Sequence, residues 1–150
     1  VRATLVPQNG GAEITLESRD LDGDGPNAPV ISVSGNLDAA TTYDVTLKIL
    51  NETESPADDI TLEILEEDEE HQFFFSFTND IATATYNDQD SNGDPIGVQF
   101  SLLTGTASTG NFTITLRHEP NKSADNVSAG NITNAGGETD VQVTFEITVN

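Results

Sequence analysis

The chain has 150 residues, a length typical of one domain with its own core, and carries 26 acidic residues against 5 lysines and arginines, a formal net charge of −21. Such an acidic surface repels nucleic acids and anionic membranes, so nucleic-acid binding is excluded as a function. The absence of cysteine and methionine excludes disulfides, zinc–thiolate sites and soft copper(I) sites.

Alternating apolar and polar residues predict strands along most of the chain. Residues 1–6 and 12–17 flank the turn Asn9-Gly10-Gly11, which predicts a β-hairpin. We expect 72–77 to be a buried strand that pairs with 81–86 across Asn79-Asp80. The remaining strands are predicted at residues 30–33, 41–50, 98–103, 111–116 and 141–149.

A helix is predicted to begin at Ser55, which offers a capping oxygen, followed by Pro56 at the first helical position. Ile60 and Ile64 lie four residues apart and share one face of this helix. The acidic run 66–70 opposes the negative end of the helix dipole, so we expect the helix to stop there after about two to three turns.

The run of phenylalanines at 73–75 cannot point to one face of a strand, because neighbouring side chains alternate. We expect Phe74 to face away from the core. It faces the other layer, the Ile60 and Ile64 face of the helix, or another protein, and we favour the helix.

Together these elements predict an all-β fold, an immunoglobulin-like or Greek-key β-sandwich of about nine strands with one short helix, formed as a single domain over residues 1–150. The segment between residues 119 and 140 is unusually long for a loop of a compact domain. It is either ordered by contacts or a ligand, or mobile.

Two loops place acidic residues at the spacing of a calcium loop, in which oxygen ligands at alternate positions point at one hard cation. Neither loop is an EF-hand, because Ile31 and Gln99 stand where the bidentate glutamate belongs. We therefore expect a cation held jointly by one of the loops and the acidic run 66–70. The alternative is that Asp, Asn and Gly simply form turns. The predicted Ca²⁺ ligands are Asp20, Asp22 and Asp24 in the first loop and Asp88, Asp90, Asn92 and Asp94 in the second.

Other chemistry has less support. His71 and His118 are the two histidines, and a site of histidine and carboxylate for a transition metal is one interpretation; surface or capping residues are the other. The chain has neither a G-x-S-x-G motif nor a glycine-rich phosphate loop, so we predict no enzymatic activity, no catalytic residues and no organic cofactor.

Five segments carry a resemblance to a known family: RDLDGDGPNAPV, NETESPADDIT, EEDEEHQ, LRHEPNKS and ITNAGGETDVQVTF. They resemble a family of small bacterial envelope proteins without an established activity, often exported with a lipoprotein-type N-terminus. The resemblance implies an exported, cell-surface protein, lipid-anchored through a removed N-terminal segment. Some members are loosely labelled type 1 periplasmic-binding-fold proteins, which implies an α/β ligand-binding protein, whereas the strand pattern here predicts an all-β one.

We therefore predict a non-enzymatic β-sandwich domain of the cell surface or envelope, stabilised by calcium, that acts as an accessory or interaction module. One alternative is a structural subunit of an extracellular assembly or filament, joined through the strands 1–6 or 141–149 as exposed edges. Another is a glycan- or solute-binding module. No apolar run approaches the roughly 20 residues of a membrane span, so we predict no direct membrane span. The expected partners are an envelope protein or further copies of the chain.

Overall fold

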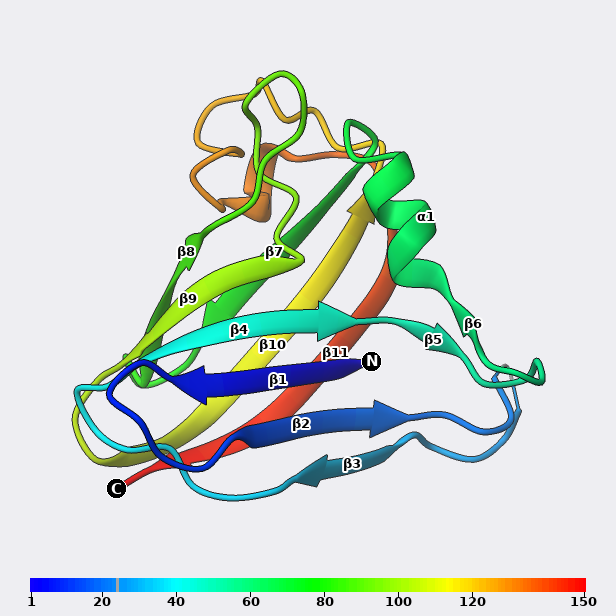
Figure 1. The fold of residues 1–150 in the computed structure, drawn as a ribbon. Helices are drawn as coiled ribbons and strands as arrows, with labels where there is room; N and C mark the ends of the chain where they lie inside the picture. The colour runs from blue at the N-terminus through cyan, green and yellow to red at the C-terminus, as the bar shows by residue number, and fades with distance from the viewer. Residues whose placement is uncertain (24) are drawn as a thin grey trace.

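The computed structural model of the protein describes residues 1–23 and 25–150 and shows a β-sandwich with one short helix (Figure 1). Over these residues, eleven strands form three sheets. The elements in chain order are β1 Arg2–Pro7, β2 Ile14–Arg19, β3 Val30–Val33, β4 Thr42–Lys48, β5 Leu50–Asn51, β6 Asp58–Asp59, α1 Ile60–Glu66, β7 His71–Phe77, β8 Ala82–Tyr86, β9 Gln99–Thr104, β10 Ser108–His118, the 3₁₀ helix η1 Ile132–Asn134 and β11 Glu138–Val149.

Two sheets form the layers of the sandwich. The six-stranded sheet has the order β3-β2-β1-β4-β9-β8 and the three-stranded sheet the order β11-β10-β7, with antiparallel pairing throughout both. In Figure 1, β10 and β11 run diagonally behind β1, β2 and β4. The short strands β5 and β6 pair with each other as a third, two-stranded sheet.

The core lies between the two layers, where alternate residues of each strand point inward. Tyr43 and Phe100 of the large sheet face Phe112 and Phe145 of the small one, and each is at most 1% exposed. Burial of one such aromatic side chain stabilises the fold by about 1.5–3 kcal/mol. The predicted all-β sandwich is confirmed, and its immunoglobulin-like Greek-key connectivity stays a prediction.

The predicted hairpin of residues 1–6 and 12–17 is confirmed, with Leu5 opposite Ile14. The predicted pairing of 72–77 with 81–86 is wrong. Instead, β7 pairs with β10 in the small sheet and β8 with β9 in the large one. The chain changes layers at the tight turn of Asn79 and Asp80, whose φ angles of 60° and 51° would also suit a hairpin. The two strands separate because each pairs with a different strand beyond the turn.

The helix begins later than predicted, at Ile60 rather than beside Ser55. The preceding residues Asp58 and Asp59 are instead held as β6 against β5, which fixes them in an extended conformation. The predicted end is confirmed, because the last helical residue is Glu66. Ile64 is buried and Ile60 packs on the core at its margin, as the shared helix face predicts.

The strand edges differ from the prediction in one respect. β1 lies inside the large sheet between β2 and β4, so residues 1–6 do not form an edge. β11 is an edge strand, although Leu37 bonds to the backbone at its C-terminal end. Within the described residues, no helix is both long and apolar enough to cross a membrane.

Candidate functional site

The second acidic loop, between β8 and β9, folds around its own carboxylates. The two oxygens of Asp88 accept hydrogen bonds from the backbone amides of Gly97, at 2.7 Å, and Gln99, at 2.8 Å. The Oδ1 atom of Asp90 accepts from the amides of Asn92 and Asp94, both at 2.9 Å. These carboxylates therefore stabilise the loop backbone and do not point toward one common centre.

Asp90 is buried, and its second oxygen contacts a positive charge. The Nζ atom of Lys122 lies 2.8 Å from Asp90 Oδ2, and both side chains are at most 5% exposed. Burial opposes ionisation of Asp90, but the hydrogen bonds from Lys122 and from the amides of Asp94 and Asn92 outweigh it and lower the pKa of this carboxyl. The ammonium group thus occupies the position at which the sequence predicts a metal ion.

Lys122 connects three segments that are distant in sequence. Its Nζ atom also donates to the carbonyl oxygen of Asp68, at 2.6 Å, in the acidic run that follows α1. Two outer contacts reinforce the arrangement: Ser91 donates to Glu69 and Ser128 donates to Asp94. We call these three segments, residues 66–70, 88–97 and 119–137, the loop end of the sandwich; Figure 1 shows them gathered at the top.

The loop end brings the second Asp loop and the acidic run together, but around an ammonium group, whereas the sequence predicts a metal cation there. The cation is the ammonium group of Lys122, and the acidic run contributes a backbone carbonyl through Asp68. Calcium at the second loop stays a prediction, but an ion there would have to displace a buried charge. Removing one partner from a buried ion pair costs about 3–5 kcal/mol, because the other charge stays unpaired.

The long loop 119–137 is ordered by contacts with the outer face of the small sheet. Phe74 points to this face, as predicted, but it packs against Val127 and Ala135 of the loop rather than against α1. The preference for the helix as its cover is therefore wrong, because α1 packs at the margin of the main core.

Beneath the loop, the Gln72 side chain donates to the carbonyl of Val127 at 3.0 Å. An open cleft of about 360 Å³ remains beside Phe74 and Ile132.

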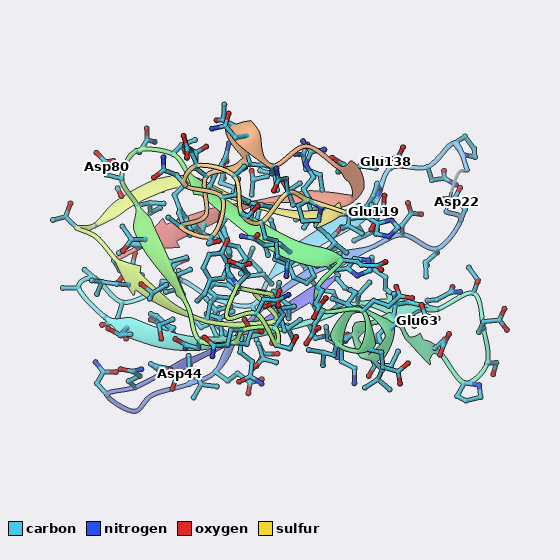
Figure 2. The ribbon with its side chains drawn as sticks, turned by 90° about the horizontal axis from the view of Figure 1, so that it is seen from above. Asp22, Asp44, Glu63, Asp80, Glu119 and Glu138 are labelled. Carbon is cyan, nitrogen blue, oxygen red and sulfur yellow. The ribbon has the colours of Figure 1, made fainter. Side chains whose placement is uncertain are left out.

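The described carboxylates of the first acidic loop, between β2 and β3, accept hydrogen bonds from the loop itself. Asp20 Oδ1 accepts from the amides of Asp22, at 3.2 Å, and Gly23, at 3.0 Å. The Asp22 carboxylate accepts from the side chain of Asn27 at 2.7 Å, which is the main reason that the pKa of Asp22 is lowered. Both carboxylates are exposed, and Figure 2 shows Asp22 far out on its loop. Asp24, the third predicted ligand, lies outside the described residues.

The structure brings together two other groups of possible metal ligands. Among the described residues, these are His71, His118 and Asp140, and Glu70, His118 and Glu119; within each group the ligand atoms lie within 4.8 Å of one another. Neither group contains a residue of the two predicted calcium loops. The calcium ligands in those loops thus stay a prediction.

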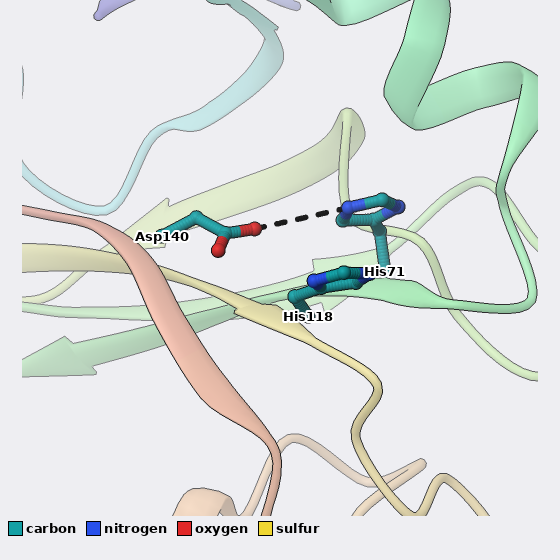
Figure 3. A group of neighbouring side chains, drawn as sticks. All are labelled: His71, His118 and Asp140. Carbon is teal, nitrogen blue, oxygen red and sulfur yellow. Dashed lines mark ion pairs between the residues drawn. The ribbon is translucent and has the colours of Figure 1, made fainter.

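The two histidines face each other across neighbouring strands. His71 begins β7, His118 ends β10, and they are directly opposite in the ladder. Their rings are stacked with centroids 4.8 Å apart and planes 7° apart. His71 Nε2 lies 3.8 Å from Asp140 Oδ2, and His118 Nε2 lies 3.8 Å from Glu70 Oε2. Figure 3 shows the Asp140 carboxylate directed toward the edge of the His71 ring.

Sequence reasoning noted the two histidines but missed Asp140 and Lys122. The pairing of His71 with His118 depends on the register of β7 and β10, which no local pattern specifies. Lys122 had a usable signal: it is one of only five Lys and Arg residues in the chain and lies in a long loop. In so acidic a chain, a lone cation in such a loop is a candidate partner for a buried carboxylate.

Comparisons of the chain with protein-family models, with curated proteins and with solved structures found no match.

Proposed function

We propose that this chain is a non-enzymatic β-sandwich module of the cell envelope, exported and exposed at the cell surface, and that it acts by binding a partner at its loop end. Calcium, held at the first acidic loop, is part of this proposal as a stabilising ion. The sequence supports an exported protein through its resemblance to envelope proteins. The location of the partner surface rests on the geometry of the loop end.

The observation that carries the proposal is the buried Lys122. Loops at one end of a sandwich are a common place for binding residues, because the sheets hold them rigidly. Here one ammonium group ties the acidic run, the second acidic loop and the long loop together through Asp68 and Asp90. A surface fixed in this way before binding loses little conformational entropy when a partner docks.

The chemistry of the loop end favours a basic partner. Its exposed acidic side chains belong to the acidic run and the long loop, whereas the acids of the second acidic loop are buried or half-buried. With Lys122 buried, the positive charge of the loop end is not presented to solvent. A negative patch of this kind steers positively charged partners into contact and rejects acidic ones. The exposed acidic residues of the loop end are Glu66, Glu67, Glu69, Glu70, Glu119 and Asp125.

A photo-crosslinking experiment in the cells that produce the protein tests this proposal. A photoreactive residue at Asn92, exposed on the loop end, is expected to give a discrete adduct in the envelope fraction. The control is the same residue at Asn9, exposed in the turn between β1 and β2 at another edge of the sandwich. Equal labelling from both positions, or recovery of the protein from the cytoplasm alone, would contradict the proposal.

An assembly role is the second candidate, and one observation favours it. β3 is an edge strand of the large sheet, with Val30 67% and Ile31 45% exposed. An exposed apolar edge can add to the sheet of a neighbouring copy. Size-exclusion chromatography and electron microscopy decide between the two: the interaction module is expected to be a monomer, and a structural subunit forms filaments.

A glycan- or solute-binding role is the third candidate, favoured by the open cleft of about 360 Å³ beneath the long loop. Its lining combines Phe74 and Ile132 with the polar side chains of Asn131 and Gln142. Pockets for small ligands have this mixture of apolar surface and few polar groups. A ligand array tests it, and loss of binding in an Ile132→Asp variant would assign the ligand to this cleft.

A further inference from the structure

We propose that His71, His118 and Asp140 form a binding site for a divalent transition-metal ion of the zinc class. The site lies at the end of the small sheet and is separate from the two acidic loops. Its ligand set, two imidazoles and one carboxylate, suits zinc and its neighbours, whereas calcium and magnesium prefer oxygen ligands alone.

His71 is held in a protonation state that suits a metal ligand. Its Nδ1 atom lies 3.0 Å from the carbonyl oxygen of Glu67. A carbonyl can only accept a hydrogen bond, so Nδ1 carries the proton and, in the neutral ring, Nε2 carries a lone pair. This tautomer leaves Nε2 free to bind a metal ion, and metal-binding histidines almost always donate the other ring N–H to a carbonyl, carboxylate or water.

The gap between His71 and Asp140 has the size that a metal ion needs. His71 Nε2 lies 3.8 Å from Asp140 Oδ2, and the His71 side chain is only 8% exposed. When the ring is neutral, both of these atoms are hydrogen-bond acceptors, so no proton joins them. This distance is too long for a hydrogen bond. An ion about 2.1 Å from each of two tetrahedral ligands holds them roughly 3.4 Å apart. A metal ion therefore fits the gap better than a shared proton does.

A β-bulge in β11 sets the position of Asp140. In the ladder between β10 and β11, Leu116 pairs with Val141 and Arg117 pairs with Thr139, so Asp140 is the extra residue. Val141 packs on the core, and in a regular strand its neighbour would point to the opposite face. A bulge redirects the side chain, and bulges are common next to functional sites for this reason.

The surroundings complete the site. The carboxylate of Glu70, 3.8 Å from His118 Nε2, offers a further ligand, and water can take an open position. Asp140 is exposed and lines an open cleft of about 340 Å³, so an ion can reach its carboxylate from solvent. The stacked imidazoles must rotate out of their parallel arrangement on binding, because an ion lies near the plane of each ring that binds it.

Calorimetric titration of the full chain with zinc chloride, in excess calcium to occupy exposed carboxylates, tests the proposal. We expect one zinc ion per chain with micromolar or tighter affinity. His118→Gln and Asp140→Asn, both at partly exposed side chains, are expected to weaken binding at least about tenfold. The matched control is Asp125→Asn, an exposed acid of the long loop outside both ligand groups, which is expected to bind zinc like the wild type.

Histidine ring NMR of the wild-type chain provides a second measurement that needs no variant. Zinc is expected to shift the ring signals of both histidines while the proton on His71 Nδ1 is retained. Zinc binding that calcium abolishes, or that His118→Gln and Asp140→Asn leave unchanged, would overturn the proposal. Ring signals that do not respond to zinc would do the same.

Discussion

The two acidic loops share one sequence pattern and have different structures. In the first, the described carboxylates of Asp20 and Asp22 are exposed and bond within their own turn. In the second, Asp90 is buried and bonds to Lys122 from a loop more than thirty residues away. The spacing of acidic residues thus predicts a turn whose carboxylates bond to nearby amides. Whether a carboxylate also pairs with a positively charged side chain depends on its burial.

The difference has a physical reason. An exposed carboxylate is solvated by water, so it needs no counter-ion and gains little from one. A buried carboxylate loses that solvation and must be paired and hydrogen-bonded. Asp90 has both kinds of partner, the Lys122 ammonium and two backbone amides. The second loop is therefore part of the folded framework, and the first remains a local surface feature.

The largest expected effect comes from removing Lys122. A Lys122→Met variant leaves Asp90 buried without its counter-ion, and we expect it to lower the free energy of unfolding by about 3–5 kcal/mol. The matched control is Lys48→Met, which removes a half-exposed ion pair with Asp59 at 3.0 Å and should cost about 0–1 kcal/mol. Urea denaturation measures both. Equal losses would show that burial does not distinguish the pairs.

The glycines beside the two loops give the next effect. At Gly97, with φ +89°, an added Cβ would lie 2.9 Å from Phe73 Cβ, so Gly97→Ala is expected to cost about 2–4 kcal/mol through backbone strain and overpacking. At Gly25 an added Cβ would meet the Asp22 side chain, which can move into solvent at the cost of its two hydrogen bonds from Asn27, about 0.5–1.5 kcal/mol each. Thermal unfolding of the two variants measures the difference, and a larger loss at Gly25 would reverse the comparison.

Acid should reduce the contribution of Asp90 in the second loop to the free energy of unfolding. The pKa of Asp90 is lowered in the folded state, so in acid the unfolded chain takes up this proton first, and stability falls as the pH falls. The contribution is complete above the ordinary Asp pKa of about 3.9 and is lost through the lower folded value. The stability difference between wild type and Lys122→Met should therefore shrink below about pH 4. A difference independent of pH would show that Asp90 is not ionised in the folded protein.

Added calcium gives the smallest expected effect on stability, and it shows which of the two loops binds the ion. At ten times the dissociation constant, calcium bound at the first loop would stabilise the fold by about 1.4 kcal/mol. We expect Asp22→Ala to remove this gain and Asp94→Ala to retain it, because Lys122 already occupies the second loop. Melting temperatures in calcium and in EDTA measure the gain. Its loss in Asp94→Ala alone would assign the ion to the second loop, and its absence in the wild type would exclude calcium.

Much of the fold could be predicted because strand patterns are local. The strand at residues 30–33, the first hairpin and the end of the helix at Glu66 follow from alternation, turn residues and the helix dipole. The start of the helix could not be predicted from Ser55 and Pro56, because the pairing of β5 with β6 overrides the local signal. The candidate sites were less accessible, since each needs residues from three separate segments.

The sequence by itself determined that this protein is an all-β sandwich with a strongly acidic surface and an Asp-rich turn at each of two loops. Those properties depend on residue type and on spacing over a few positions. Only the tertiary structure decided that β7 pairs with β10 and not with β8, that Lys122 reaches Asp90, and that His71 lies opposite His118 beside Asp140. These contacts depend on the order and register of distant strands, which are set by the packing of the whole core.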